Sequence, residues 1–358
     1  MISKMAIIGY GGMGGWHHQC LQKNVPEITV TGAYDLRKEA LEKAAQAGLR
    51  TYRKLEDVLN DSKIDIVLIA TPNDVHKTLS IAALEAGKHV ICEKPVTMNT
   101  VELEEIAPVA KKANKLFSIH HNRRWDKDFL TAKKILADNM IGKPYYIETR
   151  VQGARRNMHG WRGYAINGGG MVLDWGIHLL DQLLFLIESP VVSVDAHLLC
   201  VFSSEVEDNF KAFLRFANGI SALVEISTNC FIFQPRWHIS CESGTAIIHN
   251  FSCEGEIIKI INDEEMSWAD EIVYTAAGPT RTMAPRPSHT METLPLPQIT
   301  EDFGNYHDNT SPYYKNIVQV LKGEASPIVT ITQALRVMKL VDLIFKCAQQ
   351  GYGEQCNI

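Results

Sequence analysis

Short apolar runs alternate with amphipathic stretches along the first 120 residues of the chain. The apolar runs occupy residues 5–8, 28–34, 64–70, 89–92 and 116–119. Apolar residues at spacings of three and four, which are typical of helices, occur between them at residues 36–47, 75–86 and 101–113. Continuous apolar runs are typical of strands buried on both faces of a parallel sheet. Residues 1–120 are therefore expected to form a doubly wound α/β domain.

The pattern changes after about residue 121, where apolar and polar residues alternate. Two alternating segments, residues 210–216 and 220–226, flank Asn218-Gly219, a strong signal for an antiparallel hairpin. Further segments expected to be strands occupy residues 190–202, 236–242 and 246–250. Alternation favours strands with one buried and one solvated face. Residues 121–358 are therefore expected to form a second, α+β domain built on a mostly antiparallel sheet.

The last eighty residues contain one irregular region and two helical patterns. Residues 278–298 are rich in Pro, Thr, Arg and Met, which predicts a long surface excursion and not a core element. Residues 312–321 and 332–349 have the apolar spacing of helices. The chain is thus expected to end in two helices.

Composition and charge narrow the class of protein. The 358 residues are 46% hydrophobic and 22% charged, which is typical of globular proteins and enough for two domains. A net charge of −5 argues against a nucleic-acid or membrane surface as partner. No apolar stretch approaches the roughly 20 residues that span a bilayer, and Met1 leads into the first predicted strand without a signal peptide. The eight cysteines lack metal-finger or C-x-x-C spacing, so we expect reduced thiols, no metal site and a cytoplasmic location.

A glycine-rich turn follows the first apolar run and precedes a helical pattern at residues 16–22. Its sequence, residues 9–14, is Gly-Tyr-Gly-Gly-Met-Gly, and the strand–turn–helix context makes it a dinucleotide-binding fingerprint. Gly9 permits the tight turn, Gly11 lets the backbone approach a pyrophosphate, and Gly14 lets the helix pack on the strand. The helix N-terminus offers free N–H groups to the phosphates. The residues expected to contact the cofactor here are Gly9, Gly11, Gly12, Met13 and Gly14.

The end of the second apolar run bears on the choice of cofactor. Asp35 lies about twenty residues beyond the glycines, where a carboxylate accepts hydrogen bonds from ribose hydroxyls and repels a 2′-phosphate. NAD is therefore favoured. Arg37 and Lys38 follow closely and offer the alternative, which is to close over the phosphate of NADP.

Three polar residues are expected to carry the chemistry. Lys94 follows the run at residues 89–92, at the sheet edge where ligands of open α/β sheets bind, and its ammonium would stabilise negative charge on a reacting oxygen. Asp174 and His178 are four residues apart, so on a helix they project from one face, as does Asp181. His178 has an intrinsic pKa suited to accepting an alcohol proton near neutrality. The alternatives are an ordinary surface lysine and a core histidine capped by a carboxylate.

Polar and aromatic residues also gather on two segments that would border a substrate. These are Asn122, Arg123 and Arg124, and further along Arg155, Arg156, His159, Trp161 and Arg162. Arginines there would bind a phosphate or carboxylate with two hydrogen bonds, or equally form ion pairs between the two domains. Trp161 would stack on a sugar face or lie in the core. The predicted substrate-binding residues are Asn122, Arg123, Trp161, Arg162, Asp174 and His178.

Five motifs occur in order along the chain. They are the glycine turn with His17, Ala70-Thr71-Pro72-Asn73, Glu93-Lys94-Pro95, Asn122-Arg123-Arg124-Trp125, and the segment from Gly168-Gly169-Gly170 to Asp174 and His178. Over essentially the whole chain, this order resembles the glucose–fructose oxidoreductase/inositol dehydrogenase (Gfo/Idh/MocA) family. The resemblance implies an N-terminal Rossmann domain, a C-terminal domain on a large open sheet, and a homodimer or homotetramer paired through these sheets. It also implies hydride transfer between the nicotinamide and a ring hydroxyl of a sugar, inositol or related polyol.

The resemblance assigns roles to individual positions of this sequence. Lys94, Asp174 and His178 match the family's catalytic positions. The residues that match the edge of the family's nicotinamide pocket are Ala70, Thr71, Pro72, Asn73, His76 and Glu93. Two other activities would fit the same fold: a redox-assisted glycoside lyase or hydrolase, in which bound NAD is oxidised and reduced without net turnover, and a non-catalytic NAD-sensing regulator. The lyase needs the same three residues as a dehydrogenase, whereas a regulator would not need to retain them.

Overall fold

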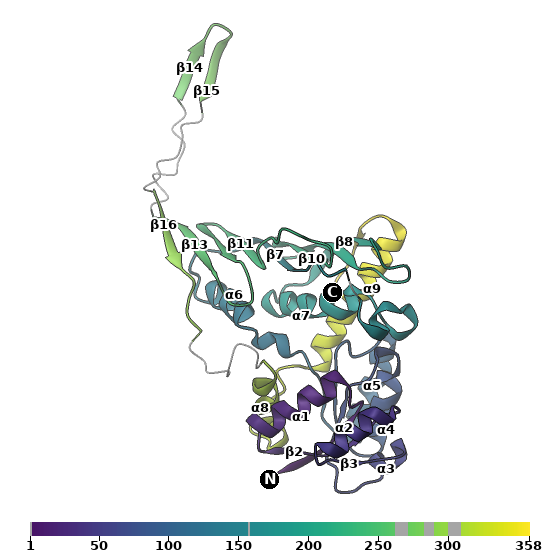
Figure 1. Ribbon diagram of the computed structural model, residues 1–358. Helices are drawn as coiled ribbons and strands as arrows, with labels where there is room; N and C mark the ends of the chain where they lie inside the picture. The colour runs from purple at the N-terminus through teal and green to yellow at the C-terminus, as the bar shows by residue number, and fades with distance from the viewer. Residues whose placement is uncertain (1, 157, 262–270, 283–289, 300–308) are drawn as a thin grey trace.

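The computed structural model describes residues 2–156, 158–261, 271–282, 290–299 and 309–358. The chain forms two large sheets, one in each half of the molecule. The glycine turn at residues 9–14 lies in the half that contains the N-terminus (Figure 1). Within the described residues, no helix is both long and apolar enough to cross a membrane. The eight cysteines all lie in the described residues, and no disulfide joins them.

The first sheet has six parallel strands in the order β3-β2-β1-β4-β5-β6. Their bounds are β1 (Ser3–Ile8), β2 (Ile28–Tyr34), β3 (Arg50–Thr51), β4 (Ile66–Ile69), β5 (His89–Cys92) and β6 (Phe117–Ile119). All four residues of β4 are buried, as expected for a strand covered on both faces. The strand order reverses between β1 and β4, which is where open α/β sheets bind ligands. The predicted doubly wound Rossmann fold is confirmed.

Helices cover both faces of this sheet. They are α1 (Gly12–Asn24), α2 (Lys38–Gln46), α3 (Leu55–Leu59), α4 (His76–Glu85) and α5 (Thr100–Ala113), with short 3-10 turns η1 (Asn73–Val75) and η2 (Asn122–Trp125). Helix α5 is capped at its N-terminus by Asn99, whose side chain accepts the backbone N–H of Glu102, and at its C-terminus by Asn114 in a left-handed conformation. The predicted helical stretches are therefore present with ends displaced by only a few residues.

The second sheet has nine strands in the order β16-β13-β12-β11-β7-β10-β9-β8-β17. Their bounds are β7 (Pro144–Gln152), β8 (Val191–Leu199), β9 (Asn209–Phe216), β10 (Ser221–Ser227), β11 (Trp237–Cys241), β12 (Gly244–Ile248), β13 (Gly255–Ile260), β16 (Met291–Pro295) and β17 (Glu354–Gln355). Only the β7–β10 pair among these is parallel. The hairpin predicted around Asn218-Gly219 joins β9 to β10, with Gly219 at a φ of 90°. The mostly antiparallel sheet is confirmed.

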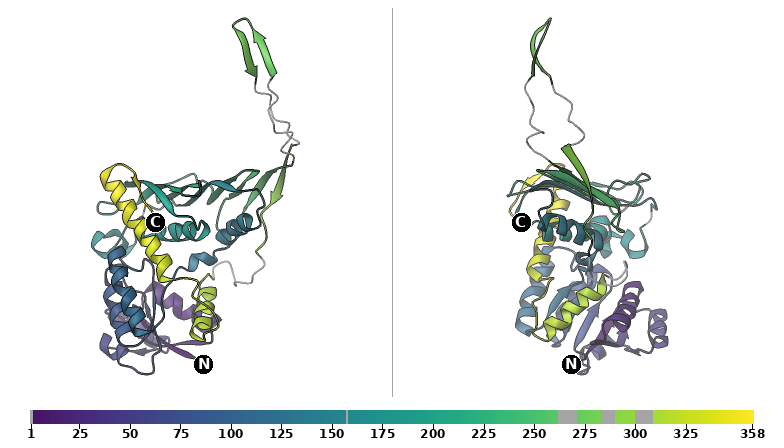
Figure 2. Two further views of the ribbon diagram at one scale, coloured as in Figure 1. Left: turned by 180° about the vertical axis from the view of Figure 1, so that it is seen from behind. Right: turned by 90° about the vertical axis from the view of Figure 1, so that its left-hand side faces the viewer.

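Helices α6 (Lys127–Ala137), α7 (Ile177–Leu186) and α9 (Ile331–Gln350) lie on one face of the second sheet (Figures 1 and 2). Alternate residues of β9 show this clearly, because Ala212 and Leu214 are buried against the helices whereas Phe213 is 41% exposed on the other face. The second sheet therefore has one packed and one open face.

The irregular region of the sequence contains more regular structure than its composition predicted. Gly278–Thr282 forms β15, which pairs with β14 (Glu271–Thr275) in a hairpin that projects from the body (Figure 1). Met291–Pro295 forms β16, the edge strand that pairs with β13. An edge strand needs backbone hydrogen bonds on one side and few buried side chains, so its composition gave little signal. Residues 283–289 lie outside the described part of the chain.

The two C-terminal helices return to the first sheet. Helix α8 (Thr310–Leu321) packs against α1, and α9 contacts α5 and β6 as well as the second sheet. In Figure 2, α8 lies beside α1 in both views. The helix α9 begins with a reciprocal capping box between Thr330 and Gln333. The predicted domain boundary between residues 120 and 121 remains a prediction. Helices α8 and α9 follow this boundary in the sequence but pack against elements that precede it.

Candidate active site

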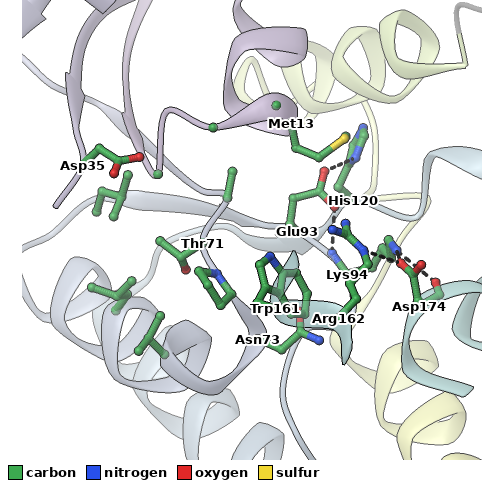
Figure 3. A pocket seen from close by; sticks show the side chains of 18 of the residues that line it. Met13, Asp35, Thr71, Asn73, Glu93, Lys94, His120, Trp161, Arg162 and Asp174 are labelled. Atoms are coloured by element: carbon green, nitrogen blue, oxygen red, sulfur yellow. Dashed lines mark hydrogen bonds and ion pairs between the residues drawn. The ribbon is translucent and has the colours of Figure 1, made fainter. Parts of the chain in front are cut away.

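A cavity of about 920 Å³ lies at the carboxyl ends of β1, β4 and β5 (Figure 3). Its lining includes twelve of the residues expected to bind cofactor: Gly9, Gly11, Gly12, Met13, Asp35, Arg37, Ala70, Thr71, Pro72, Asn73, Glu93 and Lys94. All six residues expected to bind substrate line it too: Asn122, Arg123, Trp161, Arg162, Asp174 and His178. The structure therefore brings residues from distant segments into one cavity.

The glycine turn has no room for side chains at Gly9 and Gly14, so its backbone can approach a bound dinucleotide closely. Gly9 has a φ of 93°, and a Cβ on it would lie 2.5 Å from the carbonyl oxygen of Ala70. A Cβ on Gly14 would lie 2.2 Å from the carbonyl oxygen of Gly9, so Gly14 packs behind the turn and does not line the cavity. Helix α1 starts at Gly12 without a side-chain cap, which leaves its first N–H groups available to phosphates.

Asp35 and Arg37 form a pair at one end of the cavity. The Asp35 carboxylate accepts hydrogen bonds from the Arg37 backbone N–H at 2.9 Å, Nε at 3.1 Å and Nη2 at 3.0 Å. Burial alone would raise the pKa of Asp35, but the hydrogen bonds and charge of Arg37 hold that pKa below its ordinary value. The carboxylate stays ionised, and Arg37 is held by it.

Lys94, Asp174 and Arg162 form an ionic cluster at the other end (Figure 3). The Lys94 ammonium donates to Asp174 Oδ1 and to the Asp174 backbone oxygen, both at 2.9 Å, and Arg162 Nε donates to the same Oδ1 at 3.2 Å. Burial would raise the pKa of Asp174, but the two neighbouring cations lower it below its ordinary value. Asp174 is therefore a carboxylate that fixes both cations in place.

The segment that carries Asp174 differs from the predicted regular helix. Residues Val172–Gly176 form a π-helical turn, and His178 lies in the first turn of α7. The expectation of a regular α-helix from Asp174 to His178 is therefore wrong, whereas both side chains do line the same cavity. Asp181, expected on the same face, is buried and binds Arg124 at 2.6 and 2.8 Å.

His178 is buried at the cavity wall with its ring against Trp175, the ring centres being 5.9 Å apart. Burial is the largest cause of a pKa well below the ordinary histidine value, and the charges of Lys94 and Arg123 lower it further. The expectation that its pKa lies near neutrality is thus corrected. A buried imidazole close to two cations is neutral at neutral pH and has a lone pair to accept a proton.

The arginines divide between the two roles that the sequence left open. Arg162 and Arg123 line the cavity, and the Arg123 guanidinium stacks 4.2 Å from the centre of the Trp175 ring. Arg124 instead forms a buried ion pair with Asp181 and donates to Ile328 and Gln333, so it links segments of the fold. Three further residues named from the sequence are exposed and do not line the cavity: Arg155, Arg156 and His159.

Some residues lie differently from the prediction, and others were missed. The ring of His76 is buried, with its nitrogens 2.8 Å from the Pro95 oxygen and 3.0 Å from the Thr71 oxygen, so it supports two loops behind the cavity. Trp175 and His120 line the cavity without having been predicted. Trp175 could have been predicted, because it is an aromatic residue next to Asp174, whereas nothing in the local sequence singled out His120.

Comparison with known proteins agrees with this geometry. Residues 3–121 match an oxidoreductase family with an NAD-binding Rossmann fold, and residues 129–247 match the GFO/IDH/MocA C-terminal domain. The chain belongs to the Gfo/Idh/MocA oxidoreductase family. The family resemblance expected from the motifs is thereby confirmed, and this family member is an NAD(P)-dependent oxidoreductase.

Family members of known sequence or structure align along almost the whole chain. The protein is 30% identical to the uncharacterized oxidoreductase YdgJ of Escherichia coli (strain K12), over 97% of this chain and 96% of that one. It is 26% identical to the scyllo-inositol 2-dehydrogenase (NADP(+)) IolW of Bacillus subtilis (strain 168), over 97% and 94%. A crystal structure of an NAD-binding protein from Listeria innocua is 43% identical, with a TM-score of 0.87 over 99% and 97% of the chains.

Proposed function

We propose that the protein transfers hydride between bound NAD(P) and a ring hydroxyl or ketone of a sugar, an inositol or a related polyol. The observation that carries this proposal is the cluster of Lys94, Asp174 and His178 at one end of a cavity whose other end holds the glycine turn and Asp35. The similarity to a scyllo-inositol dehydrogenase supports the substrate class. When bound, the oxidised nicotinamide supplies the hydride acceptor.

Each residue of the cluster has a role that follows from its charge. During oxidation the substrate carbon loses a hydride and its hydroxyl loses a proton, so that a C=O bond forms. His178, neutral in the cavity, accepts that proton. Lys94 donates a hydrogen bond to the oxygen and stabilises its developing negative charge. Asp174 holds the Lys94 ammonium and accepts a hydrogen bond from a substrate hydroxyl.

The low pKa of His178 suits it to both directions of the reaction. A protonated imidazole in this environment is a strong acid, because burial and the nearby cations disfavour its charge. It would return its proton readily to a ketone oxygen. The same residue therefore serves as the base in oxidation and, once protonated, as the acid in ketone reduction.

The charges of the cavity favour a neutral polyol over an anionic sugar. Arg162 is paired with Asp174, and Arg123 is paired with Asp126 at 2.9 Å, so each arginine already has a carboxylate partner. Trp161 and Trp175 add aromatic surface that would pack on the C–H face of a ring. We include NAD as the preferred nucleotide, because the ionised Asp35 would repel a 2′-phosphate.

The family resemblance also carries a proposal about assembly. The open face of the second sheet exposes Phe213 on β9 and Ile258 on β13, and Leu223 on β10 is paired with Phe213. We propose that two copies pair through this face into a homodimer, or a homotetramer built from such dimers.

The test is nicotinamide absorbance with purified protein, NAD+ or NADP+, and a panel of inositols, aldoses, sugar phosphates and glycosides. We expect substrate-dependent reduction with a neutral polyol, and a loss of about 10²–10³ in kcat for Lys94→Ala, the usual effect of removing one donor to a developing oxyanion. Lys134→Ala is the matched control, because this lysine pairs with Asp138 on the surface of α6 and should leave kcat unchanged.

Other outcomes would identify the rival activities. Cleavage of a glycoside without net NADH would indicate the redox-assisted lyase or hydrolase. Nucleotide binding without conversion of any compound in the panel would indicate the non-catalytic sensor.

A further inference from the structure

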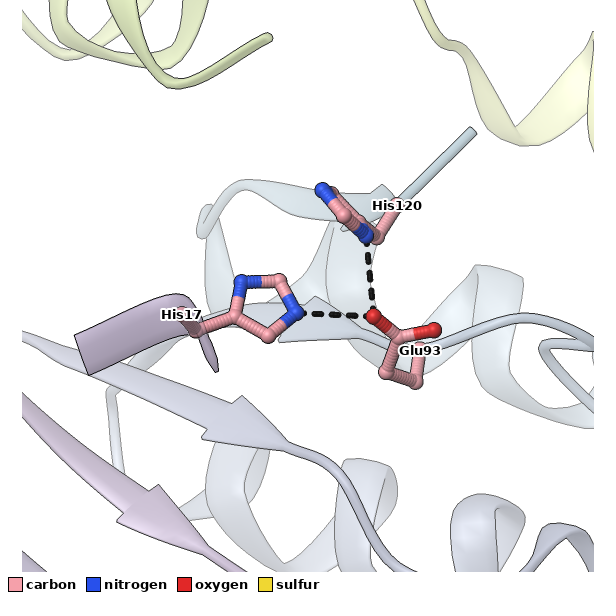
Figure 4. Close-up of side chains that lie close together, drawn as sticks. All are labelled: His17, Glu93 and His120. Atoms are coloured by element: carbon pink, nitrogen blue, oxygen red, sulfur yellow. Dashed lines mark hydrogen bonds and ion pairs between the residues drawn. The ribbon is translucent and has the colours of Figure 1, made fainter. Parts of the chain in front are cut away.

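Glu93 is the centre of a buried hydrogen-bond network beside Lys94 (Figure 4). Its Oε1 atom lies 2.7 Å from Nε2 of His17 on α1 and 2.8 Å from Nδ1 of His120, which follows β6. Its Oε2 atom accepts the Lys94 backbone N–H at 3.1 Å. The Glu93 side chain is 8% exposed, and Glu93 and His120 line the cavity. None of the roles proposed above explains this arrangement.

The positions of the protons in the network follow from its outermost member. The Tyr314 hydroxyl lies 2.7 Å from Nδ1 of His17, and burial raises its pKa well above the ordinary value, so it keeps its proton. The Glu93 carboxylate can only accept, so His17 donates Nε2–H to it, and a proton donated by Tyr314 to Nδ1 completes the two hydrogen bonds of the ring. Burial lowers the pKa of His120 to about 4, so this ring is neutral and donates Nδ1–H. Three N–H donors thus converge on one carboxylate.

A carboxylate with three donors stays ionised. Burial would raise the pKa of Glu93, but the two histidines outweigh burial and hold that pKa well below its ordinary value. The nearby ammonium of Lys94 makes its ion pair with Asp174. The cavity wall therefore contains a buried carboxylate that accepts hydrogen bonds from three N–H groups.

We propose that Glu93 sets the balance between the two oxidation states of the bound nucleotide, with His17 and His120 as positioning residues. The proposal rests on the proposed function, which places the nicotinamide at the Lys94 end of the cavity. The oxidised ring is positively charged and the reduced ring is neutral. A fixed negative charge in a desolvated wall attracts only the former. The protein should therefore bind NAD+ more tightly, relative to NADH, than it would without Glu93.

A metal ion is the competing explanation for the cluster. The three ligand atoms lie within 4.8 Å of one another, and two histidines with a glutamate are common zinc ligands. However, both nitrogens lie at hydrogen-bond distance from the same oxygen, 2.7 and 2.8 Å. Ligands placed tetrahedrally at about 2.0–2.2 Å from zinc would be more than about 3 Å apart. These distances favour the hydrogen-bonded carboxylate.

The test compares dissociation constants for NAD+ and NADH, measured by titration calorimetry without substrate. We expect Glu93→Gln to lower the ratio Kd(NADH)/Kd(NAD+) about tenfold, mainly by weakening NAD+. Asp61→Asn is the matched control. It removes a carboxylate in the same half of the molecule that accepts from Tyr52 and Arg50 and does not line the cavity. Its ratio should equal that of the wild type.

Two variants of His120 test its positioning role. They also test the proposal if the Glu93→Gln protein does not fold. His120→Leu removes a donor to Glu93, so the pKa of Glu93 should rise, and the ratio should fall as the pH is lowered across the range in which the wild-type ratio stays constant. His120→Asn keeps an N–H near the position of Nδ1 and should restore the ratio. The other titratable groups around Glu93 are Cys92, His76, His121, His178, Tyr313 and Tyr314. Burial lowers the histidine pKa values and raises the others, away from this pH range.

Three results would overturn the inference. They are an unchanged ratio in Glu93→Gln with both nucleotides still bound, an unchanged pH dependence in His120→Leu, and a stoichiometric metal ion in the purified wild-type protein by elemental analysis. A wild type that binds neither nucleotide would overturn the proposed function instead, so the two failures are distinguishable.

Discussion

Asp35 and Arg37 place opposite charges where the adenosine ribose would lie, and the carboxylate holds the guanidinium with two side-chain hydrogen bonds. A 2′-phosphate would meet the carboxylate first. Removal of the Asp35 carboxylate would reverse this preference for NAD. The Arg37 side chain is 63% exposed, so without its carboxylate partner it could turn and bind a 2′-phosphate.

We expect Asp35→Asn to shift the preference toward NADP+. Loss of the repulsion should raise the ratio Kd(NAD+)/Kd(NADP+) by at least about tenfold, as measured by titration of the two nucleotides. The double variant Asp35→Asn/Arg37→Ala is the control, since it removes the cation that would bind the phosphate and should lose most of the gain. A wild type that binds NADP+ more tightly than NAD+ would contradict this account.

Single side chains also show what the sequence could and could not predict. Lys94, Asp174 and His178 were identified from motifs, and all three line the cavity. The pKa of His178 was mispredicted, because it depends on burial and on charges from segments far away in the sequence. The partnership of His17 with Tyr314 was equally invisible, since 297 positions separate them.

The turn between β1 and α1 depends on close contact between backbones. The two adjacent glycines Gly14 and Gly15 differ sharply, because a Cβ on Gly14 would collide with the Gly9 oxygen whereas a Cβ on Gly15 would have no atom within 4 Å. Substitution of each of the two glycines in turn therefore distinguishes the packing requirement at Gly14 from the general cost of a glycine in a helix.

We expect Gly14→Ala to destabilise the protein by about 2–3 kcal/mol or more and to weaken NAD+ binding, because the strand and helix must move apart. Gly15→Ala should be neutral or stabilising by up to about 1 kcal/mol, as alanine favours helix over glycine. Thermal unfolding and nucleotide titration of both variants provide the measurement. Equal effects of the two substitutions would show that packing behind the turn is not what Gly14 provides.

Regular elements were predicted where the physical signal was strong. Continuous apolar runs gave all the longer strands of the first sheet, and Asn218-Gly219 gave the hairpin of β9 and β10. The π-helical turn at Val172–Gly176 was missed, because its hydrophobic pattern differs from that of an α-helix by a single residue. The edge strand β16 was missed because it buries little.

The two halves of the molecule are held together by buried polar contacts as well as by apolar packing. Arg124 follows the first sheet, binds Asp181 of α7, and also donates to Ile328 and Gln333 before and within α9. Both members of the ion pair are 2% exposed, so this contact is fully buried where the two halves meet. The cavity between them is therefore formed by elements with fixed relative positions.

The proposed pairing through the open face of the second sheet predicts a change in mass. We expect light scattering after size-exclusion chromatography to give a dimer or tetramer for the wild type. Phe213→Asp should give smaller species, because it places a charge at the centre of an apolar contact. Val101→Asp is the control, as this residue is 63% exposed on α5, away from the sheet. A monomeric wild type would refute the proposed assembly.

Helix α8 completes the nucleotide-binding half from the far end of the chain. Tyr314 binds His17, Tyr313 binds Ser118 at 2.9 Å, and Asp342 of α9 accepts the Thr100 backbone N–H at 3.0 Å. The ribosome releases the N-terminal segments first. The last fifty or so residues must therefore be synthesised before the flank of α1 is covered and His17 gains its contact with Tyr314. A fragment that ends after β6 would lack that cover, so the nucleotide-binding half is not a transferable module.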